Sequence, residues 1–87
     1  MQPDEEVVKT PLDIAKAHLS RLKQMAHDGK NVIEQLAEMQ LSFEDELKEK
    51  DIADRVGDLF GEENSFMEML QSLIDDYEFK VNEMEAA

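Results

Sequence analysis

Apolar residues recur at alternating spacings of three and four along most of this chain, which is the period of an amphipathic α-helix. The pattern covers residues 11–28, 32–60 and 66–85. The composition agrees, because Glu, Lys, Ala, Leu and Met are abundant while there are only two prolines and three glycines. The sequence therefore predicts three helices and an all-α fold.

Residues with helix-capping chemistry mark where these helices begin and end. Thr10, Asn31 and Ser65 each precede a helical pattern and are followed three positions later by an acidic residue, which favours a helix start. Gly29 and Gly61 follow the first two patterns, where a left-handed residue commonly ends a helix. We therefore expect a helix to end at each of these glycines.

The apolar face of the first predicted helix is wider than one stripe. Ile14, His18 and Met25 lie beside its central seam, so we expect this helix to contact two neighbours. The seam itself has the spacing of a coiled coil and consists of Leu12, Ala15, Leu19, Leu22 and Ala26.

The second predicted helix changes phase near residues 48–51, which indicates a kink or a loop. Acid-first pairs at i,i+4, such as Glu44 with Lys48 and Asp51 with Arg55, support an unbroken helix by a few tenths of a kcal/mol each. We favour continuity. Its roughly 29 residues would then span about 43 Å, whereas its neighbours would span only about 27–30 Å.

These lengths predict a small antiparallel three-helix bundle with a long central helix, or four helices if the central one is interrupted. Part of the long helix would be uncovered in a monomer, so we expect a homo-oligomer. Residues 1–9 are expected to form a disordered acidic leader, and residues 10–87 a single helical domain.

Composition narrows the location and chemistry. The chain has no cysteine, no long apolar run and an acidic N-terminus, so we expect a cytoplasmic protein with no membrane contact. No serine or threonine has a patterned histidine partner, and His18 and His27 are nine residues apart, which does not suit one metal. The isolated glycines do not form a phosphate loop. We therefore expect no enzymatic activity, no metal and no cofactor.

The distribution of charge is the feature of the sequence that points to a function. Residues 1–30 hold five acidic and five basic side chains, while residues 31–87 hold 17 acidic and four basic ones, which accounts for the whole net charge of −13. Such a field repels DNA, RNA and anionic lipids and attracts basic protein surfaces. Phe79 lies among carboxylates on the predicted third helix, like an aromatic anchor with a polar rim, although a contact within the chain or with a second subunit would also explain it. The candidate partner-binding residues are Glu44, Asp45, Glu62, Glu63, Glu68, Asp75, Asp76, Phe79 and Glu83.

We therefore expect a non-enzymatic acidic helical interaction module, an adaptor, inhibitor or regulator that docks on a basic surface of a partner protein. In its sharpest form the module mimics nucleic acid and occupies the binding groove of a nucleic-acid-binding protein. The alternative is a structural or assembly protein, such as a homo-oligomeric helical scaffold or a chaperone-like bundle.

Overall fold

A computed structural model describes residues 10–87 of the chain. Helix α1 spans Pro11–Leu41, a short π-helical segment, η2, spans Ser42–Glu46, and helix α2 spans Lys50–Ala86. No strand occurs among the described residues, so the predicted all-α class is confirmed. The predicted leader over residues 1–9 lies outside the described residues.

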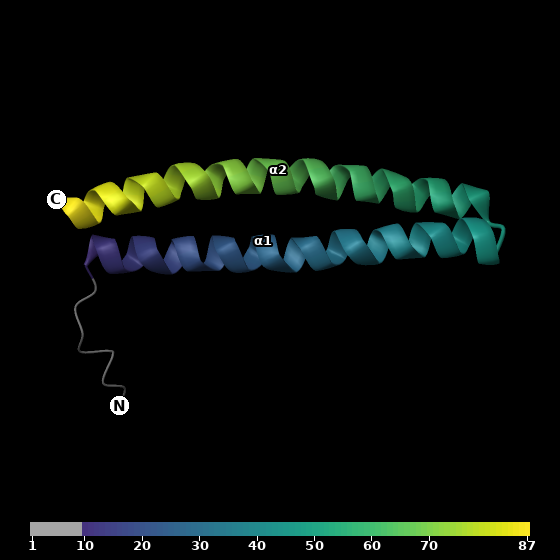
Figure 1. The fold of residues 1–87 in the computed structure, drawn as a ribbon, viewed down its shortest axis with the longest axis horizontal. Coiled ribbons are helices and arrows are strands. Elements are labelled where there is room, and N and C mark those ends of the chain that lie inside the picture. Colours follow the sequence, from purple (N-terminus) through teal and green to yellow (C-terminus); the bar gives the residue numbers. More distant parts are fainter. Residues whose placement is uncertain (1–9) are drawn as a thin grey trace, which may run out of the picture.

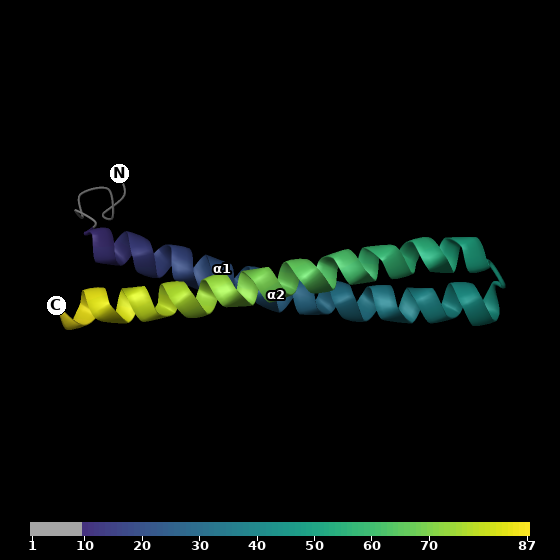
Figure 2. The same cartoon turned by 90° about the horizontal axis from the view of Figure 1, so that it is seen from above.

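The two long helices lie side by side and run in opposite directions (Figure 1). The turn is at one end of the molecule, and the start of α1 and the end of α2 lie together at the other, open end. Seen from above, the helices cross at a shallow angle (Figure 2), as helices joined by a heptad seam do. The longest axis of the molecule is 58 Å. The described chain is a single-layer helical hairpin.

The predicted division into three helices is wrong at both glycines. Gly29 lies inside α1 and Gly61 lies inside α2, and neither has a positive φ. Asn31 and Ser65, which the sequence suggested as N-caps, are internal helical residues as well. The physical reason is that the contacts between the helices continue past each glycine, and an internal glycine costs a helix only about 1 kcal/mol.

The predicted start of the first helix is confirmed. The Asp13 backbone N–H donates to Thr10 Oγ1 at 3.1 Å, and the Thr10 backbone N–H donates to Asp13 Oδ2 at 3.2 Å. Pro11 follows at the first helical position, where its missing N–H costs nothing. This capping box satisfies backbone donors at the helix start that would otherwise lack partners.

The predicted continuous helix through residues 48–51 is also wrong, because the chain reverses direction there. The Leu47 N–H donates to the Ser42 carbonyl at 3.0 Å, and the Glu49 N–H donates to the Phe43 carbonyl at 2.8 Å. Lys48, with φ 57°, has left-handed backbone geometry. The expected central helix is thus divided between α1 and α2. The described chain forms a two-helix hairpin instead of the predicted three- or four-helix bundle.

One seam of contacts joins α1 to α2. Gly29 packs against Met67, and Gln40 packs against Gly57, so residues whose numbers add up to about 96 face each other. The largest cluster of buried seam residues lies toward the open end and consists of Ala15, Leu19, Ala26, Leu70, Ile74 and Val81. The full heptad seam is Leu12, Ala15, Leu19, Leu22, Ala26, Gly29, Ile33, Leu36, Gln40 and Phe43 in α1, with Ala53, Val56, Phe60, Glu63, Met67, Leu70, Ile74, Tyr77, Val81 and Met84 in α2.

Candidate interaction surfaces

The seam leaves the hairpin with two broad faces, one on each side of the plane that contains both helix axes. In an antiparallel pair of heptad helices, the residues that flank the seam on one side of α1 lie beside the residues that flank it on the same side of α2. The two sets of flanking residues differ in chemistry along the middle of the hairpin, although the second set also includes His18 and Lys80 toward the open end.

The first set forms a polar face. Lys23 Nζ donates to Glu78 Oε2 at 2.7 Å, and Lys16 pairs with Glu85. These side chains are about half exposed, so each ion pair contributes at most about 1 kcal/mol. Both pairs nevertheless fit the same register of α1 against α2. The polar face consists of Lys16, Lys23, Lys30, Gln71, Glu78 and Glu85.

The second set forms an apolar face. Its members recur every seven residues on each helix, so they make one continuous stripe along each. Their exposed fractions run from 43% for Val32 to 58% for Leu59, although all six are large and apolar. A stripe of this kind is the usual signature of a protein contact, whereas scattered exposed apolar residues are ordinary. The apolar face consists of Met25, Val32 and Met39 in α1, with Leu59, Phe66 and Leu73 in α2.

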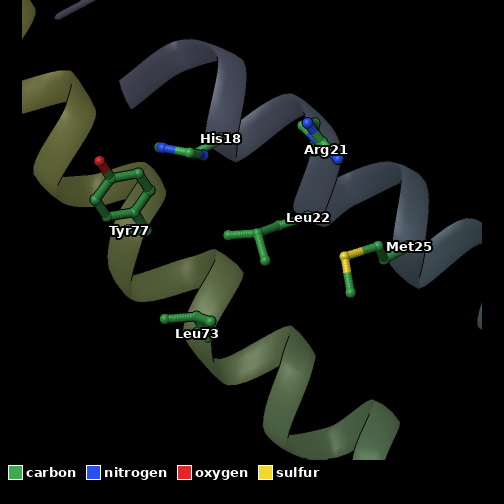
Figure 3. A pocket seen from close by; sticks show the side chains of 6 residues that line it. All are labelled: His18, Arg21, Leu22, Met25, Leu73 and Tyr77. Carbon is green, nitrogen blue, oxygen red and sulfur yellow. The ribbon is translucent and has the colours of Figure 1, made fainter. Parts of the chain in front are cut away.

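A groove of about 370 Å³ opens on the apolar face near the open end. Figure 3 shows Leu22 reaching from α1 toward α2, with Leu73 and Tyr77 on α2 across the groove. His18 and Met25 continue the α1 wall. Leu22 and Tyr77 belong to the seam itself, so the groove is a place where the seam is incompletely covered.

A second groove, of about 420 Å³, lies near the turn. Ile52 and Leu59 line it together with Val56 from the seam and the charged side chains of Arg55 and Asp58. Ile52 and Leu59 belong to the same seven-residue repeat as Phe66, so this groove continues the apolar face. The apolar face therefore has a groove toward each end of the hairpin.

The structure does not gather the predicted partner-binding residues into one site. Glu44 and Asp45 lie in η2 beside the turn, whereas Glu83 lies near the far end of α2. Glu63 occupies a seam position and is half-buried, with its carboxylate near Gly29. These four acidic residues therefore lie in three different surroundings.

The remaining candidates lie along the exposed surface of α2. Glu62 and Asp76, by their heptad positions, border the apolar face. Glu68, Asp75 and Phe79 point outward, away from α1, and Phe79 is 66% exposed. The role of Phe79 in binding stays a prediction.

Net charge is uneven along the hairpin. Residues 33–65, on the turn side of Val32 and Phe66, carry eleven acidic and three basic side chains, a net charge of −8. The described residues on the open side, 10–31 and 67–87, carry eight acidic and five basic ones, a net charge of −3. The strongest negative field therefore surrounds the turn.

Other chemistry is sparse in the described part of the chain. His18 lies on the apolar face, whereas His27 lines a groove on the polar face beside Lys23 and Glu78. Residues 10–87 contain no group of three metal-ligating side chains and no buried charged residue. Within the same residues, neither long helix has an apolar stretch sufficient to span a lipid bilayer.

Sequence reasoning identified Met25 as part of a wide apolar face but missed that Val32, Met39 and Leu59 continue it. The signal was present as the seven-residue repeat, and it becomes readable once α1 is taken as one helix.

The sequence matches no family model, and no curated protein or solved structure is significantly similar to it.

Proposed function

We propose that this chain is a non-enzymatic protein-interaction module whose apolar face packs against an α-helical surface of another polypeptide chain. The observation that carries the proposal is the contrast between the two faces. One face pairs its charges within the hairpin, while the other exposes about half of each of six large apolar side chains. Covering such a stripe removes apolar surface from water, which is the main driving force of association.

The shape of the apolar face favours a helical partner. Its side chains recur every seven residues on two neighbouring helices. One groove opens between the helices beside Leu22 and Tyr77, and a second lies along α2 beside Ile52 and Leu59. Side chains of a facing helix that carry the same period can enter such grooves as knobs enter holes.

A binding comparison tests the proposal. The chain is immobilised, and the proteins it retains from an extract of its source cells are quantified for the wild type and for the double variant Met39→Gln/Leu59→Gln. We expect the variant to lose at least tenfold in retention, whereas the polar-face control Lys30→Ala/Gln71→Ala keeps wild-type retention. Equal retention by both variants would show that the apolar face is not the binding surface.

The charge around the turn supports a second contact, the docking of this module on a basic protein surface. The net charge of −8 on the turn side would be relieved by a cationic partner, and a nucleic-acid-binding protein is the sharpest case. Such binding should weaken steeply with added salt and be displaced by competing DNA. Neutralising Glu44 and Asp45 should weaken it more than neutralising Glu83 and Glu85 at the open end. The cytoplasmic location expected from the sequence belongs to this proposal as well.

A further inference from the structure

We infer that a second copy of this chain covers the apolar face, placed so that two hairpins form an antiparallel four-helix bundle with their turns at opposite ends. The inference rests on the proposed function, because it assigns a partner to the same face. It adds the identity of that partner and the symmetry of the contact.

The apolar face is self-complementary about its own middle. On α1, Met25 and Met39 lie seven residues on either side of Val32. On α2, Leu59 and Leu73 flank Phe66 in the same way. A two-fold axis through the middle therefore places the central residue of each stripe against its own copy and the flanking residues against each other. This is the isologous contact of a symmetric dimer.

The exposed area is what a stable dimer requires. Six large side chains, each about half exposed, present on the order of 600 Å² per copy, so two copies would bury on the order of 1,200 Å² in total. Specific protein interfaces begin at about that size. The residues that precede Thr10 offer fewer apolar groups, since their large apolar side chains are Met1, Val7 and Val8.

Charge selects the antiparallel arrangement. With both turns at the same end, the two regions of net charge −8 would lie side by side. With the turns at opposite ends, each region of −8 lies beside a region of −3, which lowers the repulsion between the copies. The same arrangement brings Lys80, which follows Leu73 in the seven-residue repeat, and Arg21, which borders the apolar face on α1, toward the acidic turn side of the other copy.

Light scattering coupled to size-exclusion chromatography tests the dimer with the full chain. A dimer doubles the 10.0 kDa mass of the chain at micromolar concentration. Phe66→Glu should return the mass to that of one chain while circular dichroism still reports helix. Gln71→Glu adds the same charge to the polar face and should leave the dimer unchanged. A wild-type chain that stays at the mass of one copy at every concentration, or forms a larger assembly, overturns the inference.

Disulfide cross-linking tests the symmetry without relying on a variant that disrupts the dimer. Because the natural chain has no cysteine, each introduced cysteine is the only one in its chain. Val32→Cys alone should form a cross-linked dimer on mild oxidation. Met39→Cys alone should not, whereas an equimolar mixture of Met25→Cys and Met39→Cys chains should. If Val32→Cys cross-links only with Phe66→Cys chains, the turns lie at the same end and the antiparallel arrangement is wrong.

The two proposals can fail separately. If the wild type is monomeric but the Met39→Gln/Leu59→Gln variant still loses its bound proteins, the proposed dimer is wrong and the proposed interaction module stands. A dimer that persists in Phe66→Glu would place self-association elsewhere and equally remove this inference.

Discussion

At the residue scale, the turn depends on a lysine in a conformation that suits glycine. Lys48 has φ 57°, and among the described residues no other non-glycine residue has a positive φ. A side chain with a Cβ makes left-handed backbone unfavourable by about 1 kcal/mol or more. The neighbouring hydrogen bonds from Leu47 and Glu49 hold it there.

Replacing Lys48 by glycine should therefore stabilise the hairpin by about 0.5–1 kcal/mol, because the backbone strain is removed. Urea unfolding followed by circular dichroism at fixed protein concentration measures the change. Lys48→Ala is the matched control, since it removes the same charge but keeps the Cβ, and it should give no stabilisation. A loss of stability in Lys48→Gly would show that the lysine side chain contributes more than its backbone costs.

The turn could not be located from residue types alone. Leu47, Lys48 and Glu49 include no glycine, proline or asparagine, so no familiar turn signal stands there. The change of phase near residues 48–51 did mark the place. The local acid–base pairs argued for continuity, but pairs worth a few tenths of a kcal/mol each are too weak to decide between a helix and a turn.

At the scale of the helices, continuity of the seam outweighs local stop signals. The stripe that ends at Ala26 in the first predicted helix is in phase with Ile33 in the second, and Gly29 fills the position between them. The sequence contained this phase relation, so α1 could have been predicted as one helix. Asn31, two residues after Gly29, could not be distinguished from a true N-cap by sequence, because residues with capping side chains also occur inside helices.

The variant Gly61→Ala tests whether α2 continues through residue 61 or a helix ends there. In the middle of an exposed helix, alanine should stabilise α2 by about 0.5–1 kcal/mol, because it restricts the unfolded chain and favours the helix. A Cβ at Gly61 would meet no atom within 4 Å. Thermal and urea unfolding at matched concentration measure the effect. Destabilisation would mean that a helix ends there after all.

Gly29→Ala is the contrasting variant. A Cβ at Gly29 would overlap Met67 Sδ, so this side chain would have to move before the helix propensity of alanine could stabilise α1. We expect a smaller gain than at Gly61, or a loss. A gain as large as that of Gly61→Ala would show that the seam at Gly29 is looser than the structure describes.

At the scale of the whole molecule, negative charge opposes the compact state. The chain carries 22 acidic and nine basic side chains, and the ion pairs on the polar face are too exposed to offset the repulsion. The all-α class and the excess of negative charge were readable from composition. The apolar face was only partly predictable, because its extent depends on the correct register of α1 against α2.

Added salt should therefore stabilise this protein. Raising NaCl from about 20 mM to about 1 M shortens the screening length from about 20 Å to about 3 Å, which weakens long-range repulsion more than short ion pairs. We expect the melting temperature to rise by on the order of 5 °C. Circular dichroism melts at one protein concentration provide the measurement. A fall in melting temperature would mean that attractive pairs such as Lys23 with Glu78 dominate.

The register of the seam also has a consequence for how the chain folds. The contacts that are easiest to form join residues near the turn, and that part of the seam already buries Ala53 and Val56. The largest cluster of buried residues joins Ala26 to the region of Leu70, about 40 residues away along the chain, so closing that loop directly from the unfolded chain costs more entropy. Pairing can therefore begin at the turn and extend along the seam toward the open end, with each step closing only a short loop, so the hairpin should fold quickly.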